Sequence, residues 1–315
     1  MLSFAPLAVL SFWALSAEAQ ISIRPRQTSL ATKQSIPSAM RADSNLVLIP
    51  VGVTDLLNCP VMGLDKSSFR VFDSNVEQQV LTLAFEDAPL AVGLVFDRSS
   101  SMEGKMDKSR AAVVQFLRTA NPEDEFFLVE FNDQVHLKQP WTSDPSDILA
   151  ELGSDPHGKT ALLDAIALSL GELKKSSKPR KALVILSDGR DNHSRYNRRE
   201  ILDMARESDA LIYAMGIFAY PGAQLRPEEV SGPSLLTDVT EASGGRLFPV
   251  GDLNDLPDVA RRIGVELHNQ YVLGYSPGNL QADGKHHKVK VKVAPPRGLS
   301  YLHVDWRAGY RAPVE

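Results

Sequence analysis

The stretch PLAVGLVFDRSSSM, residues 89–102, decides the fold of this chain. It begins with an almost unbroken apolar run that ends in Asp97, a pattern typical of a strand buried on both faces of a parallel sheet. Open α/β folds place their ligand sites at the carboxyl ends of such strands. The oxygen-rich residues after the run, DRSSSM, are therefore predicted to lie at a ligand site.

Helical and strand patterns alternate along the chain after this first strand. The strand patterns are EFFLVEF, VHLK, KALVILSD, ALIYAMGIF and RLFPV. Amphipathic helical patterns separate or follow them. They lie at residues 107–119, 160–174, 197–207 and 253–269, and one more pattern ends with ASGG at residues 242–245. Such alternation indicates an α/β fold with a doubly wound, mostly parallel sheet. The predicted α/β domain spans residues 88–270.

Apolar and polar residues alternate at period two on both sides of this domain. The stretches before it are NLVLIPVGV, SFRVFDS and EQQVLTLAFE, and those after it are QYVLGYSP, HHKVKVKVAP and SYLHVDW. QADGK predicts a hairpin-like turn between QYVLGYSP and HHKVKVKVAP. Because three strands alone have little to pack against, residues 40–87 and 271–315 are predicted to form one β-sandwich into which the α/β domain is inserted.

The first residues predict export. MLSFAPLAVLSFWALSAEAQ contains an apolar run followed by Ala-Glu-Ala at 17–19, the small-x-small pattern that signal peptidases accept. We therefore expect residues 1–19 to be a signal peptide and the protein to be secreted or periplasmic. The apolar run has roughly a dozen residues, fewer than the ~20 that a bilayer requires, so no membrane span is expected.

Charge and cysteine content limit the classes of partner and the means of stabilisation. Lys and Arg total 34 against 39 Asp and Glu, and a net charge of −5 does not attract nucleic acid. The single cysteine, Cys59, cannot form an internal disulfide. We expect it to be a small buried residue in a fold held by packing.

Oxygen-bearing side chains recur where predicted strands end and helices begin. Asp97, Ser99 and Ser101 are spaced by two, so a loop that curls into a helix can turn one carboxylate and two hydroxyls toward one point. Thr160 opens a later helix, and Asp188 ends a second buried strand. Oxygen ligands without His or Cys select a hard cation, Mg²⁺ first, with Mn²⁺ or Ca²⁺ as alternatives. These five residues are the predicted metal ligands.

The octapeptide GSDPHGKT, residues 153–160, supports a competing interpretation because it satisfies the pattern of a nucleotide phosphate loop. A genuine phosphate loop leaves the end of a buried strand. Here the preceding SDPSDILAEL has apolar residues three and four apart, which predicts a short amphipathic helix. KALVILSD does resemble the strand that holds Mg²⁺ in such ATPases. A metal- or nucleotide-dependent hydrolase using the same strand-end site is therefore the alternative function.

Other enzyme classes require residues that stand elsewhere or are replaced here. A haloacid-dehalogenase-type phosphatase would place a second Asp two residues after Asp97, where Ser99 stands. A receiver domain would need paired acidic residues ahead of the first buried strand, and a serine hydrolase would need a Gly-x-Ser-x-Gly elbow. Since no base or nucleophile accompanies the predicted ligands, we expect a binding protein and not an enzyme.

Taken together, Asp-x-Ser-x-Ser, a later Gly-x-Thr and a strand ending in Ser-Asp-Gly resemble the metal-ion-dependent adhesion site of von Willebrand factor type A domains. The resemblance covers residues 88–270, with the three segments in the family's order. The flanks VTDLLNCPVMGLDKSSFRVFDSNVEQQV, YVLGYSP, DGKHHKVKVKV and RAGY are similar to the bacterial exported group called VWFA-related. That group often has Ser-Gly-Ser in the metal loop, whereas this chain has Ser-Ser-Ser, which keeps both hydroxyl ligands.

The resemblance implies roles for the predicted ligands. Ser99, Ser101 and Thr160 would contact the metal directly or nearly so, and Asp97 and Asp188 would act directly or through waters. It also implies a protein-binding or adhesion module whose cation engages a carboxylate, from Asp or Glu, on a partner that the sequence does not identify. The Gly-Lys-Thr of the octapeptide would then belong to the family's threonine loop.

Overall fold

The computed structural model describes residues 46–57, 59–86, 88–218, 227–277, 284–296, 301–307 and 309–312. All of them belong to one compact unit, Asn45–Glu315. The signal peptide predicted at residues 1–19 lies outside the described residues, as does the beginning of the predicted N-terminal flank.

The central sheet has the strand order β10-β9-β8-β5-β6-β7. Its strands are β5 (Leu90–Asp97), β6 (Glu125–Phe131), β7 (Val135–Thr142), β8 (Arg180–Ser187), β9 (Ala210–Ile217) and β10 (Leu247–Val250). Neighbouring strands are parallel except for β6 and β7, which are antiparallel. The prediction of a doubly wound, mostly parallel sheet is confirmed.

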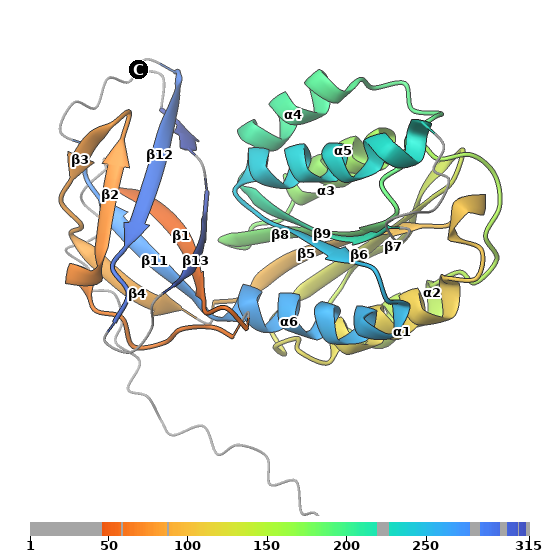
Figure 1. The fold of residues 1–315 in the computed structure, drawn as a ribbon, viewed down its shortest axis with the longest axis horizontal. Helices are drawn as coiled ribbons and strands as arrows, with labels where there is room; N and C mark the ends of the chain where they lie inside the picture. The colour runs from red at the N-terminus through yellow and green to blue at the C-terminus, as the bar shows by residue number, and fades with distance from the viewer. Residues whose placement is uncertain are drawn as a thin grey trace, which may run out of the picture. The chain divides into compact units, whose positions relative to one another are not determined.

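Helices cover both faces of this sheet (Figure 1). One face carries α1 (Met106–Leu117), α2 (Pro145–Glu151) and α6 (Leu256–His268), and the other carries α3 (Leu162–Leu173), α4 (Arg198–Glu207) and α5 (Pro227–Ser243). Alternate residues of β5 enter the two resulting cores: Val92 and Leu94 pack in the first, and Ala91 and Val95 in the second. Burial on both faces explains why β5 has an almost unbroken apolar sequence.

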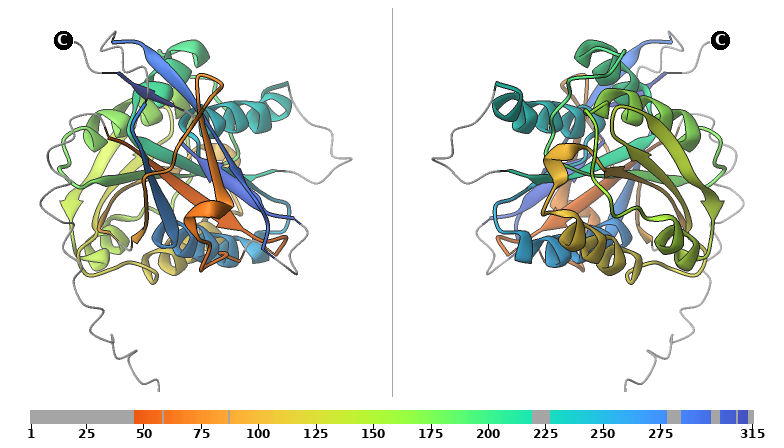
Figure 2. Two further views of the ribbon diagram at one scale, coloured as in Figure 1. Left: turned by 90° about the vertical axis from the view of Figure 1, so that its left-hand side faces the viewer. Right: turned by 90° about the vertical axis from the view of Figure 1, so that its right-hand side faces the viewer.

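Two further sheets form a sandwich from both flanks of the α/β domain. Their strand orders are β13-β1-β11-β4 and β14-β12-β2-β3. The strands are β1 (Val47–Thr54), β2 (Phe69–Asp73), β3 (Val76–Gln78), β4 (Thr82–Glu86), β11 (Gln270–Tyr275), β12 (His286–Val293), β13 (His303–Trp306) and β14 (Gly309–Arg311). Figure 2 shows early and late strands of the chain, in orange and blue, side by side in these sheets. The predicted insertion of the α/β domain into a sandwich of both flanks is confirmed.

The strand partners within the sandwich differ from expectation in two places. β11 pairs with β1 and β4, whereas β12 pairs with β2 and β14, so the predicted hairpin between β11 and β12 is wrong. The stretch EQQVLTLAFE is not one strand either, because it divides into β3 and β4, which lie in different sheets. Period-two alternation specifies which side chains face the core but not which strand lies alongside.

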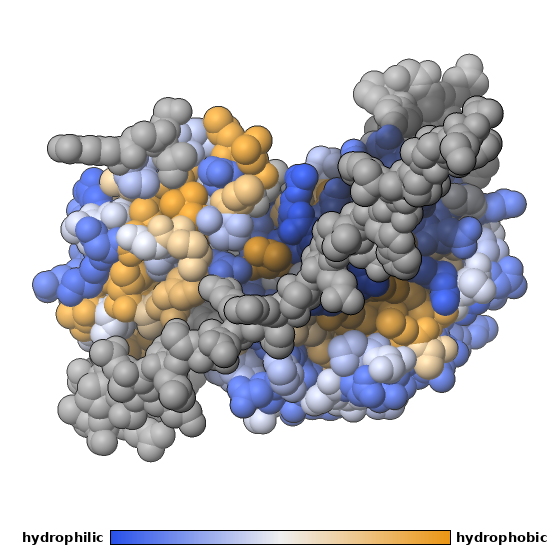
Figure 3. All heavy atoms as spheres, turned by 90° about the horizontal axis from the view of Figure 1, so that it is seen from below, coloured by the Kyte–Doolittle hydropathy of each residue, from blue (hydrophilic) through white to orange (hydrophobic). Residues whose placement is uncertain are grey.

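Exposed apolar residues of the described chain are concentrated in the sandwich. Leu56 and Leu57 are 70% and 74% exposed. Figure 3 shows hydrophobic surface on its left-hand part, where the sandwich lies in Figure 1. Cys59 is also exposed, so the prediction of a buried cysteine is wrong. It follows a turn in which the Asp55 carboxylate accepts bonds from the backbone N–H groups of Leu57 and Cys59. Among the described residues, no helix is long and apolar enough to cross a membrane.

Candidate metal centre

Parallel pairing of β5 and β8 brings Asp97 and Asp188 to the same edge of the central sheet. Phe96 on β5 lies beside Leu186 on β8, and the two strands end one residue later, at Asp97 and Ser187. The Ser187 hydroxyl donates a hydrogen bond of 2.5 Å to Asp97 Oδ2. The ends of the two buried strands are therefore joined side chain to side chain.

The metal loop, residues 97–102, follows β5 and gathers the first three predicted ligands. Asp97 and Ser99 are both fully buried. The Ser99 backbone N–H donates to Asp97 Oδ1 at 2.8 Å, and the Ser99 and Ser101 hydroxyl oxygens are hydrogen-bonded at 3.0 Å. A 3₁₀ turn at Ser100–Met102 curls the chain, and the fully buried Met102 anchors it in the core. The spacing of two thus brings the carboxylate and two hydroxyls together, as predicted.

Thr160 lies in the threonine segment, residues 153–161, which connects α2 to α3. It is 2% exposed. Its backbone N–H donates to Asn192 Oδ1 at 3.0 Å, and its carbonyl accepts bonds from the N–H groups of Asn192 and His193. Toward the metal loop, the Ser100 N–H donates to the Gly158 carbonyl at 3.1 Å. The threonine segment is therefore hydrogen-bonded both to the metal loop and to the Asp188 loop, residues 187–193.

The carboxylate of Asp97 lies in an unfavourable electrostatic environment. Burial and the negative charge of Asp188 raise the pKa of Asp97 to about 6, although hydrogen bonds from Ser187 and Ser99 act in the opposite direction. Two carboxylates thus repel each other where little water can screen them. Hydroxyl and carboxylate oxygens are also the ligands that hard divalent cations prefer. The donor set of hydroxyls and carboxylates fits such an ion.

Sequence reasoning missed three residues at this site. Ser187 bonds to Asp97, as described above, and its signal was its position directly before Asp188 on a strand beside β5. Lys105 Nζ and Arg190 Nε lie 3.2 and 3.4 Å from Asp188 Oδ2. Lys105 lies at the beginning of α1, and only the fold reveals that this position faces Asp188. Both cations lie against Asp188 and offset its negative charge.

The octapeptide GSDPHGKT does not have the geometry of a phosphate loop. Helix α2 precedes it, where a phosphate loop would follow a strand, and this helix was expected from the sequence. Lys159 is exposed, whereas its neighbour Thr160 is buried. Of these two neighbours, the buried Thr160 and not the exposed Lys159 therefore lies where a metal ligand is expected.

We predict that Thr160→Val weakens Mn²⁺ binding whereas Lys159→Ala leaves it nearly unchanged. Removing the exposed ammonium group is expected to change Mn²⁺ affinity by less than about twofold, since exposed charges interact weakly with their surroundings. Removing the buried hydroxyl is expected to weaken Mn²⁺ binding by about tenfold or more. Calorimetry with Mn²⁺, and then with ATP alone, measures both. Affinity for ATP that Lys159→Ala abolishes would restore the nucleotide-binding interpretation.

Comparison with known proteins agrees with the class that this fold defines, an open α/β domain with a ligand face at the carboxyl ends of its strands. The family model of the von Willebrand factor type A domain matches residues 92–190. The structure of von Willebrand factor type A from Catenulispora acidiphila is similar over 77% of this chain and 73% of that chain, with a TM-score of 0.50 and 13% sequence identity. Residues 92–190 are therefore similar in sequence to the von Willebrand factor type A domain, and the α/β domain has the fold that this similarity predicts.

Two further proteins are similar over smaller shares of this chain. The PilB minor pilin from Streptococcus sanguinis matches over 57% of this chain and 61% of that chain, with a TM-score of 0.46 and 17% identity. An uncharacterized protein of Borreliella burgdorferi is 24% identical over 185 residues, which make up 50% of this chain and 53% of that protein. The chain thus spans about half the length of this curated relative.

Proposed function

We propose that this protein is an exported protein-binding module that engages a carboxylate of its partner through a divalent cation, Mg²⁺ first, held by Asp97, Ser99, Ser101, Thr160 and Asp188. Von Willebrand factor type A domains are in general interaction modules, and residues 92–190 are similar to one. The observation that carries the proposal is the hydrogen-bonded junction of three oxygen-rich loops around Asp97. The apolar leader in the sequence supports export to the periplasm or the outside of the cell.

The charges at the candidate site suit an acidic partner. Asp97 and Asp188 bring two negative charges, which only balance a divalent cation, while the serine and threonine hydroxyls are neutral. When bound, the cation supplies an electrophilic centre that exchanges water for an anionic oxygen. Lys105 and Arg190 lie beside Asp188 and add positive charge next to that position. Complementary charge of this kind steers an acidic segment toward the site.

The geometry favours binding over hydrolysis. An aspartyl nucleophile needs an oxygen that is free to attack, but Asp97 is fully buried. One of its oxygens accepts the Ser99 N–H and the other accepts the Ser187 hydroxyl. These bonds hold the carboxylate in place, which suits a ligand more than a nucleophile. A phosphatase or ATPase activity of the purified protein that rises with added Mg²⁺ would favour the alternative, a metal- or nucleotide-dependent hydrolase.

The proposal is tested with a partner recovered on the immobilised protein in Mg²⁺ and then purified. We expect binding to be lost in EDTA, to return with added Mg²⁺, and to be lost when the carboxyl groups of the partner are amidated. Lys159→Ala serves as the control variant because its ammonium group is exposed beside the site. Binding that survives EDTA would place the interaction on another surface, and the sandwich with its exposed apolar residues would be examined first.

A further inference from the structure

One buried carboxylate fastens two of the three loops at the metal centre. Glu130 on β6 is 2% exposed, and it lies on the same face of the strand as Phe126 and Leu128, which pack in the core beneath α1 and α2. A carboxylate in such surroundings is costly unless it is paired and hydrogen-bonded. Glu130 has both kinds of partner: Arg98 Nη1 lies 2.9 Å from Oε2, and the Gly153 N–H donates to Oε1.

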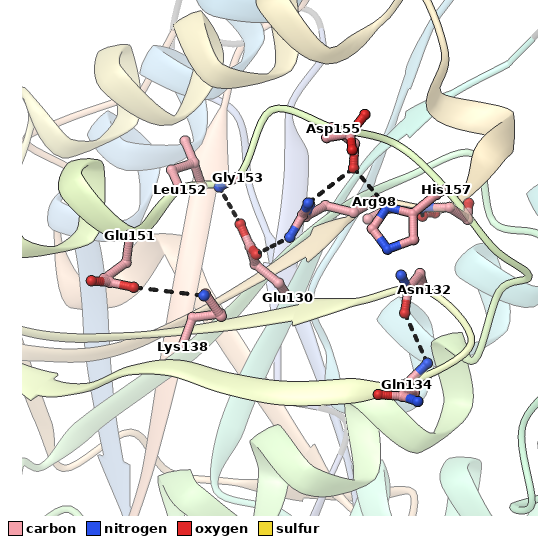
Figure 4. A network of polar contacts seen from close by, with 12 residues as sticks. Arg98, Glu130, Asn132, Gln134, Lys138, Glu151, Leu152, Gly153, Asp155 and His157 are labelled. Carbon is pink, nitrogen blue, oxygen red and sulfur yellow. Dashed lines mark hydrogen bonds and ion pairs between the residues drawn. The ribbon is translucent and has the colours of Figure 1, made fainter.

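Arg98 extends this connection along the threonine segment, as Figure 4 shows. It directly follows Asp97 in the metal loop, and its Nη2 donates to the Asp155 carbonyl at 2.9 Å. Its own carbonyl accepts a bond of 2.8 Å from the His157 N–H, while its own N–H donates to Phe131 on β6. The residue between two predicted metal ligands therefore holds the threonine segment through both its side chain and its backbone.

Gly153 lies directly against the side chain of Arg98. A Cβ atom at this position would lie 2.6 Å from Cζ and 2.6 Å from Nε of Arg98, which is shorter than any van der Waals contact. The guanidinium group therefore occupies the space that any side chain would need. The first glycine of the octapeptide serves this contact with Arg98, which accounts for a glycine there without a nucleotide.

We propose that Arg98 and Glu130 are positioning residues of the metal centre. The pair fixes the start of the threonine segment against the metal loop, and so sets where the Thr160 hydroxyl lies relative to those of Ser99 and Ser101. This inference rests on the proposed function, because the hydroxyls matter only as ligands. Residues that orient metal ligands typically change metal affinity by about 10- to 100-fold when they are replaced.

The test compares Glu130→Gln with Glu77→Gln in the full chain. Glu77 also pairs with an arginine, Arg70, at 2.7 Å, but this pair is exposed on the sandwich. Glu130→Gln is expected to raise amide hydrogen exchange over residues 153–161 in metal-free protein by about tenfold, with exchange in β5 and β6 unchanged. It is also expected to weaken Mn²⁺ binding, measured by calorimetry, by about tenfold or more. Glu77→Gln should change neither quantity.

The outcomes separate this inference from the proposed function. Wild-type protein that binds no Mn²⁺ would overturn the proposed function and this inference with it. Wild-type binding that Glu130→Gln leaves unchanged would overturn the inference alone, whether or not hydrogen exchange rises. Should Glu130→Gln fail to fold, Gly153→Ala replaces it, because this change keeps every charge and displaces only the guanidinium group. Unchanged Mn²⁺ affinity in Gly153→Ala would equally overturn the inference.

Discussion

Asp97→Asn is expected to abolish Mn²⁺ binding and, at the same time, to stabilise the metal-free protein at pH 7. The folded pKa of Asp97 is about 6, above its ordinary value of 3.8, because the carboxyl is buried and faces Asp188. Between these two pH values the unfolded chain releases its proton while the folded chain retains it. Stability therefore falls as pH rises through this window and stays lower at pH 7, by about 3 kcal/mol.

Asparagine removes this cost because it carries no charge, and its amide oxygen can still accept the Ser99 N–H. We expect a gain of up to about 3 kcal/mol in the free energy of unfolding at pH 7, measured with urea, and a loss of Mn²⁺ affinity of about 100-fold or more. The double variant Ser99→Ala with Ser101→Ala is the matched control. It removes two ligands without removing charge, so it should weaken Mn²⁺ binding without the gain in stability. An Asp97→Asn protein that still binds Mn²⁺ would contradict the assignment.

A second carboxyl group should make stability depend on pH without any part in metal binding. Glu266 on α6 is 2% exposed and accepts a hydrogen bond of 2.9 Å from the Tyr213 hydroxyl of β9. Asp305 on β13 lies across from it, and Arg246 lies 3.8 Å from Glu266 and 4.0 Å from Asp305. Burial and the charge of Asp305 raise the pKa of Glu266 to about 7, against the opposing effect of Arg246.

Glu266→Gln is therefore expected to stabilise the protein at pH 8 but not at pH 4. Since the ordinary pKa of glutamate is 4.5 and the folded value is about 7, stability falls as pH rises between them. The full effect is about 3 kcal/mol in the free energy of unfolding, which glutamine avoids while its amide oxygen keeps the Tyr213 bond. Urea unfolding at both pH values measures it.

The exposed Glu123 provides the control, because Glu123→Gln makes the same chemical change in a turn on the surface. It should shift the free energy of unfolding by less than about 0.5 kcal/mol at either pH. A Glu266→Gln protein that is less stable than wild type at pH 8 would show that the ion pair with Arg246 outweighs the desolvation of the carboxylate.

Local patterns were enough to predict most elements of the α/β domain. Buried parallel strands such as β5 and β8 are read from apolar runs, and helices such as α4 from their amphipathic faces. The sandwich was harder because its strands share one period. Nothing local distinguishes a β11 that pairs with β1 from one that pairs with β12. The pairing depends on contacts between segments that are distant in the sequence.

The candidate site shows the same division between local and distant information. Asp97, Ser99 and Ser101 lie within one loop, so their spacing was enough to predict that one carboxylate and two hydroxyls can face the same point. Glu130 has no sequence motif, and its partners are distant along the chain. Its one signal was an acidic residue inside the apolar strand pattern EFFLVEF, which calls for a buried partner without naming it.

The insertion of the α/β domain also determines how mechanical tension travels through the molecule. The chain enters that domain from β4 and leaves it into β11, and Glu86 at the end of β4 is paired with Gln270 at the start of β11. Entry and exit are thus held together as neighbouring strands of one sheet. A force applied to the two ends of the chain is carried by the hydrogen bonds between β4 and β11. It reaches β5 only after these two strands have separated. The loops around Asp97 are shielded from load while the sandwich remains closed.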